Sequence, residues 1–190
     1  LYPSVFEGWG EKGVVPLPKN GLPASTNVAI VYDFIPYRFH SHFLDHDLRF
    51  KQAYLNRLES LKDFDLLLAI SESTRQDTIQ ILNFSPDRVV NLSGATSSKF
   101  RKMDYAPETV EDLYSRLKLT KPFIFYAGNA EFHKNMEGFL RAFSRLPQAI
   151  KDKYQIVFTH IGDETVFRNK IRALGYSDDS IVITGHISDD

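Results

Sequence analysis

Short apolar runs alternate along the chain with segments of helical periodicity, and this alternation constrains the fold more than any other feature. Apolar strands that are each followed by a helix are typical of parallel βαβ units, in which helices cover the faces of a sheet. The predicted strands are Val28–Tyr32, Leu66–Ile70, Val89–Leu92, Phe123–Ala127, Gln155–Ile161 and Ile181–Thr184. The sequence therefore predicts an α/β fold built on Rossmann-like parallel sheets.

Apolar stripes at helical spacing lie between these runs, and their residues are expected to pack inward. The stripes are Leu44, Leu48, Leu55, Leu58 and Leu61; Val110, Leu113 and Leu117; Met136, Phe139, Leu140, Phe143 and Leu146; and Phe167, Ile171 and Leu174. After the second strand, Ser73–Gln76 has the pattern of a capping box, and the helix that follows is expected to end near Asn83. Gly175 is expected to end the last helix.

A stretch of small and polar residues separates two series of βα units. It runs from Ser93 to Ser98 and on towards Pro107, and we interpret it as an interdomain linker. Residues 1–102 are then the latter part of one Rossmann-like domain, and residues 103–190 are the first half of a second. Neither end resembles a domain end, so both domains are expected to be truncated. The segment from Gly8 to Pro23 is rich in glycine and proline and is expected to form a long loop.

Composition excludes several classes of function. With 23 basic and 24 acidic side chains the net charge is -1, which gives no general reason to bind nucleic acid or an anionic membrane. The absence of cysteine excludes a disulfide scaffold and a thiolate metal centre. The longest apolar run, Leu66–Ile70, has only the length of a strand, so no membrane span is predicted.

Two groups of residues suit either a structural or a functional role. Histidines and carboxylates between His40 and Asp47 could hold a divalent ion, but Asp45 and Asp47 precede a helix and are ordinary capping residues, so no metal site is predicted. Trp9, Tyr37 and Phe39 could stack on a sugar, although anchoring a loop by burial is the commoner use of such aromatic side chains.

The segment Phe123–Asn135 carries the clearest functional signal. An apolar strand ends at Gly128, a polar loop follows, and Lys134 is expected at the start of the next helix. Free backbone N–H groups and the helix dipole favour an anion there, glycine permits close approach, and lysine adds a mobile positive charge. A diphosphate would fit this loop. The same residues would equally suit a loop that only begins a helix and leaves its lysine exposed.

Gly128–Asn135 followed by Leu140–Phe143 resembles the donor-phosphate loop and following helix of retaining GT-B glycosyltransferases, in the large family that contains sucrose synthases and bacterial mannosyltransferases. Further segments resemble successive landmarks of its mannosyltransferase-like branch in the same order. They are Phe6–Gly8, Val31–Pro36, Leu66–Ser73, Arg88–Gly94 and Ile181–Ser188. The resemblance therefore spans nearly the whole chain and implies parts of the two Rossmann-like domains of a GT-B protein. Residues 1–102 would belong to the N-terminal, acceptor-side domain, and residues 103–190 would belong to the C-terminal domain that binds the nucleotide-sugar donor.

On this resemblance Lys134 would contact the donor diphosphate, and Gly128 would keep the loop close to it. Relatives commonly carry an arginine directly after that glycine, where this chain has Asn129. Neutralisation would then fall to Lys134 and to helix N-termini, with His133 as a third donor.

Two more segments carry site residues by resemblance. Gly185, His186 and Ile187 match the turn whose backbone meets the nucleotide base. Asp33 lies in the acceptor-facing loop, and Tyr32 stands where many relatives have a histidine.

The family's two glutamates, separated by seven residues, hold the donor sugar and are expected beyond Asp190. Catalytic residues are therefore not assigned, and we expect this chain alone to show negligible transfer, because catalysis depends on orienting the sugar.

The implied reaction is transfer of a hexose, mannose, from GDP-mannose to a polysaccharide or lipid-linked glycan with retention. It needs no cofactor and no metal, and it would take place in the cytoplasm, at the inner face of the membrane. The alternative is a non-catalytic glycosyltransferase-like module that binds a glycan, nucleotide or protein, which Asn129 and Tyr32 favour.

Overall fold

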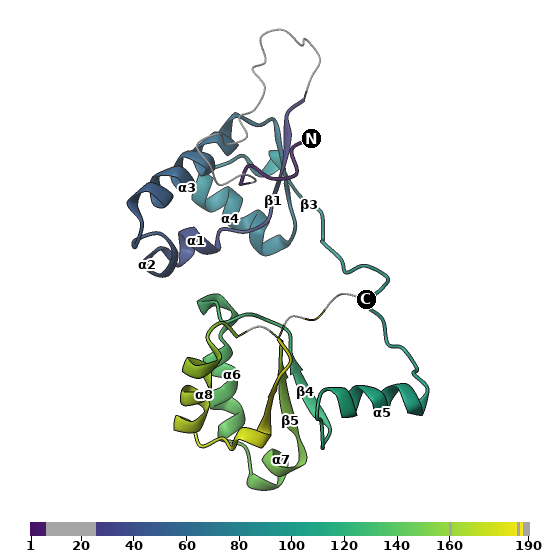
Figure 1. Cartoon of the computed structure of the whole chain (residues 1–190). Helices are drawn as coiled ribbons and strands as arrows, with labels where there is room; N and C mark the ends of the chain where they lie inside the picture. The colour runs from purple at the N-terminus through teal and green to yellow at the C-terminus, as the bar shows by residue number, and fades with distance from the viewer. Residues whose placement is uncertain (7–25, 160, 186, 188–190) are drawn as a thin grey trace. The chain divides into compact units, whose positions relative to one another are not determined.

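The computed structural model describes residues 1–6, 26–159, 161–185 and 187 (Figure 1). The chain divides into two compact units, Leu1–Arg101 and Lys102–Asp190. This division lies one residue before the predicted boundary, and the assignment of the units to acceptor-side and donor-side domains stays a prediction. The loop predicted from Gly8 to Pro23 lies outside the described residues, as does Trp9.

The first unit is built on a parallel sheet of order β1-β2-β3. Val28 pairs with Leu66, and Leu67 pairs with Val89. Its elements are β1 (Val28–Val31), α1 (Ile35–Arg38), α2 (His40–Phe43), α3 (Leu48–Ser60), a 3-10 turn (Leu61–Asp63), β2 (Leu66–Ala69), α4 (Glu72–Leu82), a 3-10 turn (Pro86–Arg88) and β3 (Val89–Asn91). The predicted strands are confirmed, each slightly shorter than expected.

The predicted leucine face of the first unit is correct in part. Leu44, Leu58 and Leu61 are buried in the core, but Leu48 is 78% exposed. The reason is that Asp47 caps α3 and accepts hydrogen bonds from Arg49 N and Phe50 N, so Leu48 is the first residue of the helix. Leu44 lies in the turn before α3 and packs into the core from that turn. The periodicity had predicted that it belongs to the helix.

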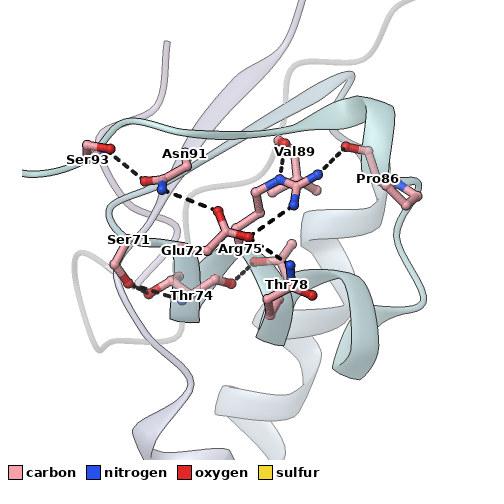
Figure 2. A network of polar contacts seen from close by, with 10 residues as sticks. Ser71, Glu72, Thr74, Arg75, Thr78, Pro86, Val89, Asn91 and Ser93 are labelled. Carbon is pink, nitrogen blue, oxygen red and sulfur yellow. Dashed lines mark hydrogen bonds and ion pairs between the residues drawn. The ribbon is translucent and has the colours of Figure 1, made fainter.

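Helix α4 is fixed to the sheet by a polar network (Figure 2). The predicted capping box is wrong by two residues, because the cap is Ser71, whose hydroxyl accepts from Thr74 N at 3.1 Å. Thr74 in turn donates its hydroxyl to the carbonyl of Tyr32 at 2.9 Å, and Arg75 donates to the carbonyl of Val89 at 3.0 Å. Side chains of α4 thus hold the ends of β1 and β3. The helix ends at Asn83, as predicted, in a left-handed conformation.

The second unit repeats the plan with a parallel sheet of order β4-β5-β6. Its elements are α5 (Pro107–Arg116), β4 (Phe123–Tyr126), a 3-10 turn (Phe132–Lys134), α6 (Met136–Ser144), α7 (Gln148–Lys153), β5 (Gln155–Phe158), α8 (Glu164–Ala173), a 3-10 turn (Asp178–Ser180) and β6 (Ile181–Ile183). Figure 1 shows α6 and α8 side by side, and their apolar residues share one buried cluster with β5.

Most of the predicted inward residues of the second unit do pack inward. Leu140, Phe143, Phe167 and Ile171 are buried, and Gly175 follows α8 with a φ of +84. The exceptions are Val110 and Leu146, which are exposed. Helix α5 has no fully buried residue and packs through Tyr114, whose ring lies 6.0 Å from that of Phe123, while α6 ends at Ser144 before it reaches Leu146.

Among the described helices, none combines the length and the apolar character that a membrane crossing requires.

Candidate functional site

The segment between β4 and α6 lies at the carboxyl edge of the second sheet. Open parallel sheets bind ligands at this edge, because the loops that leave the strands converge there. Strand β4 ends at Tyr126, and α6 begins at Met136. Lys134 is the last residue of the 3-10 turn, two positions before the helix, which corrects the prediction that it begins the helix.

Asn135 takes the capping position of α6. Its φ of +54 is left-handed, which asparagine tolerates better than most residues, and its Oδ1 accepts a hydrogen bond from Gly138 N at 3.2 Å. A Cβ at position 138 would lie 2.4 Å from that oxygen, so only glycine leaves room for the cap. One of the helix N–H groups expected to be free for an anion is therefore already satisfied.

The four residues predicted to bind the donor phosphate share this loop but differ in their surroundings. Asn129 Oδ1 accepts from Glu131 N at 3.2 Å, so this side chain shapes the loop. His133 Nε2 lies 3.6 Å from a carboxylate oxygen of Glu131. Lys134 is exposed, and no carboxylate of a described residue forms an ion pair with its ammonium group. Lys134 is thus the residue of this loop whose charge remains available to an anion.

Tyr126, the last residue of β4, is hydrogen-bonded to the backbone of the loop. Its hydroxyl donates to the carbonyl of Lys134 at 2.7 Å, and burial raises its pKa. A Cβ at Gly128 would lie 2.9 Å from the Tyr126 ring, so glycine allows the ring and the loop to approach closely. The sequence did not single out Tyr126. The one signal was an aromatic side chain with a polar tip at the end of an apolar strand.

A cavity of about 490 Å³ adjoins the loop. It is lined by residues 130–132, the start of α6, and the side chains of Arg141 and Lys170. Glu137 lies between these two cations, with its oxygens 2.6 Å from Arg141 and 2.8 Å from Lys170. Hydrogen bonds from Lys170 and then Arg141 lower the Glu137 pKa to about 2. The sequence missed this cluster because Lys170 comes from α8.

The turn predicted to meet the nucleotide base follows β6. Gly185 has a φ of +71, and Ile187 is exposed, while His186 lies outside the described residues. Because β4, β5 and β6 are parallel, this turn and the loop after β4 leave the same edge of the sheet.

Tyr32 and Asp33, predicted on the acceptor side, line a cavity of about 290 Å³ in the first unit. Asp33 Oδ1 accepts from Ile35 N at 2.9 Å, which fixes the turn into α1. Tyr54 of α3 also lines this cavity, and burial followed by the charge of Asp33 raises its pKa well above the usual range. The two predicted residues, which are consecutive in the sequence, thus line the same cavity.

No protein-family model matches the chain. It is 30% identical over 190 residues to the serotype-specific mannosyltransferase WbdA of Escherichia coli, and the match covers 98% of this chain and 23% of WbdA. The structure of Anabaena HepE in complex with UDP-glucose matches with a TM-score of 0.62 at 12% identity, over 85% of this chain and 42% of HepE. WaaG, a glycosyltransferase involved in lipopolysaccharide biosynthesis, matches with a TM-score of 0.62 at 14% identity, over 87% of this chain and 46% of WaaG. The chain has the GT-B glycosyltransferase fold.

The predicted fold class and the resemblance to mannosyltransferases are therefore confirmed. The chain spans about a quarter of the length of the curated relatives that it matches first, which are 22–23% covered. The roles predicted for individual site residues of this GT-B chain stay predictions.

The segment from His40 to Asp47 of the GT-B chain has a structural role. Asp47 caps α3, as predicted, whereas Asp45 binds Lys51 and His40, each at 2.8 Å. No three metal-ligating side chains gather anywhere in the described part of the chain, and the expectation that no metal is needed stays a prediction. Tyr37 and Phe39 are exposed, which contradicts their interpretation as buried anchors.

The ion pairs of Glu137 give a testable dependence on pH. Because the folded-state pKa is lowered from 4.5 to about 2, their stabilising effect is present above pH 4.5 and is lost as the pH falls toward 2. We expect the Tm difference between the wild type and Glu137→Gln to shrink as the pH is lowered from about 6 to about 3. Glu111→Gln is the control, because Glu111 lies past the first turn of α5, is exposed and forms no ion pair with a described residue, so it should show no such convergence. A difference that stays constant across this range would contradict the prediction.

Proposed function

We propose that the protein to which this chain belongs is a retaining glycosyltransferase that transfers mannose from GDP-mannose to a polysaccharide or lipid-linked glycan. The second unit would bind the nucleotide sugar, and the first unit would face the acceptor with Asp33 and Tyr32. The observation that carries the proposal is the exposed Lys134, without a carboxylate partner among the described residues, on a glycine-bearing loop at the carboxyl edge of a parallel sheet.

The comparisons support this proposal at different levels. WbdA is named a mannosyltransferase and matches nearly the whole of this chain, which supports the sugar that is transferred. HepE shares the fold and was crystallised with UDP-glucose, which supports a nucleoside diphosphate sugar as donor. Retention and the guanine base rest on the resemblance to the family.

The chemistry of the proposed step explains the need for Lys134. As the glycosidic bond of the donor breaks, negative charge accumulates on the leaving diphosphate. An ammonium group beside that diphosphate stabilises the transition state more than the ground state, because the charge grows along the reaction. His133 would be a further donor in this loop. No metal is needed in this scheme.

Calorimetry on this chain with GDP, UDP, guanosine and uridine tests the proposal. We expect the diphosphates to bind at least about tenfold more tightly than the nucleosides, since a charge-assisted hydrogen bond contributes roughly 1.5–3 kcal/mol. A preference for GDP over UDP would support GDP-mannose as donor. Equal binding of diphosphate and nucleoside, or no binding of either, would remove this loop from donor recognition.

A second candidate function is a non-catalytic module that binds a glycan, nucleotide or protein. The observation that favours it is the side chain of Asn129, which is hydrogen-bonded within its own loop in place of the arginine that relatives use. Transfer assays with the full-length protein separate the two functions, because a binding module would show no turnover with any nucleotide sugar.

The proposed site of action is the cytoplasm, at the inner face of the membrane, where a lipid-linked acceptor would be reached. A cell-fractionation experiment on the full-length protein tests this, and a secreted protein would contradict it. We propose no nucleic-acid partner, because the chain carries a net charge of -1.

A further inference from the structure

We propose that Tyr126 is a positioning residue that holds Lys134 in the orientation needed to meet the donor diphosphate. This inference rests on the proposed function for the role of Lys134. The anchoring of the turn by Tyr126 rests on the contacts alone. Tyr126 would touch no ligand. It would act through the backbone of Lys134.

The contact is made at a sensitive point of the chain. The Tyr126 hydroxyl donates to the carbonyl of Lys134, which belongs to the peptide unit that joins Lys134 to Asn135. Asn135 has a φ of +54, an uncommon backbone conformation that persists when surrounding contacts favour it. This hydrogen bond to the carbonyl and the one that Asn135 N donates to Phe132 O together fix the rotation of that peptide unit. They therefore fix both the exit of Lys134 from the turn and the cap of α6.

Tyr126 is well placed to fix this peptide because its ring is held by the core. Its centroid lies 5.2 Å from that of Phe139 on α6 and 5.2 Å from that of Phe158 on β5. Gly128 closes on the ring from the loop, since a Cβ there would come within 2.9 Å of it. The hydrogen bond from this hydroxyl thus holds the turn in a fixed position relative to β5 and α6.

The turn needs such an anchor because its own hydrogen bonds are local. Lys134 N donates to Glu131 O at 3.0 Å, and Asn135 N donates to Phe132 O at 3.1 Å. These bonds set the shape of the turn without fixing it to the sheet. The Lys134 side chain is exposed, so the direction in which it leaves the turn depends on the backbone beneath it.

Tyr126→Phe removes the hydroxyl and leaves the ring, so it tests the contact with little change in packing. We expect GDP to bind this chain more weakly, by at most about fivefold, because the free turn would sample other orientations without this bond and ordering it on binding can cost no more than the bond contributes. Tyr176→Phe is the matched control, because that hydroxyl also donates to a backbone carbonyl, Leu140 O at 2.6 Å, but this bond is buried and its acceptor lies in the middle of α6, not in the turn. The control should leave GDP affinity unchanged.

A double-mutant cycle then decides whether Tyr126 acts through Lys134. If it does, Tyr126→Phe should add less than about twofold to the loss caused by Lys134→Ala, because the group that it positions is already gone. Fully additive losses would overturn the proposal.

Amide hydrogen exchange without ligand separates this inference from the proposed function. In Tyr126→Phe the Lys134 and Asn135 amides should exchange about fivefold faster, whereas in Tyr176→Phe they should not change. If the wild type binds no GDP but this change in exchange is seen, the proposed function fails and the anchoring role of Tyr126 survives. Unchanged exchange at both amides in Tyr126→Phe would overturn the anchoring role, whatever the binding result.

Discussion

Replacing Lys134 with alanine is expected to weaken the binding of GDP to this chain by about 10- to 150-fold, which corresponds to the roughly 1.5–3 kcal/mol of a hydrogen bond to a charged group. The physical reason is that the ammonium group is exposed and forms no ion pair with a described residue, so its whole charge is available to the diphosphate. In the full-length protein the rate of transfer should fall by a comparable factor or more, because the leaving group gains charge in the transition state.

Two controls make this result specific. Lys153→Ala removes another lysine of the same unit, at the end of α7, which precedes β5 and so lies at the opposite edge of the sheet. It should leave GDP binding unchanged. Lys134→Arg keeps the charge on a longer side chain and should recover part of the loss. The unfolding midpoint should not move in either Lys134 variant. Unaltered GDP affinity in Lys134→Ala would exclude the lysine from the site.

Replacing Gln155 with leucine is expected to destabilise the second unit by about 3 kcal/mol, since three partly buried hydrogen bonds to backbone groups are lost at roughly 1 kcal/mol each. Gln155 begins β5 and is only 3% exposed. Its Oε1 accepts from Thr120 N at 2.8 Å and from Lys121 N at 3.1 Å, and its Nε2 donates to Asp179 O at 2.9 Å. Leucine fills similar space but offers none of these groups.

The stability of the Gln155→Leu variant is measured by urea unfolding of the chain, monitored through a signal that reports on the second unit. Gln148→Leu is the matched control, because among the described residues that amide bonds only Asp152, on the surface of α7 at 2.7 Å, and the substitution should change stability by less than about 0.5 kcal/mol. At urea concentrations well below the unfolding midpoint, both variants should still bind GDP, since Gln155 lies at the amino edge of the sheet. A loss of stability below about 1 kcal/mol in Gln155→Leu would show that water replaces the amide.

The strands and most of the helices of this protein were determined by the sequence itself. Their signal is the period of the apolar residues, and that period depends only on neighbours a few positions away. The loop from Gly128 to Lys134 could also be recognised in the sequence as a candidate diphosphate site, because its glycine and lysine lie on one short segment after a strand. The GT-B fold was implied by the resemblance of the sequence motifs to those of retaining GT-B glycosyltransferases, and the structural matches then confirmed it.

Errors in the sequence prediction fall where one local rule competes with another. Ser71 is the cap that the structure uses, although Ser73 fits the capping-box pattern, because strand β2 ends early enough for the helix to begin at Glu72. Leu48 fits the leucine period and is nevertheless exposed, because the cap at Asp47 makes it the first residue of α3.

Only the tertiary structure decided which side chains support the loop. Tyr126 meets the carbonyl of Lys134 because β4 and the turn fold back on each other, and Lys170 meets Glu137, 33 positions away in the sequence, because α8 packs beside α6. Gln155 bonds Thr120 and Asp179 for the same reason. Hydrogen bonds and ion pairs require atoms to lie within a few ångströms, and no period in the sequence encodes that distance for residues on different elements.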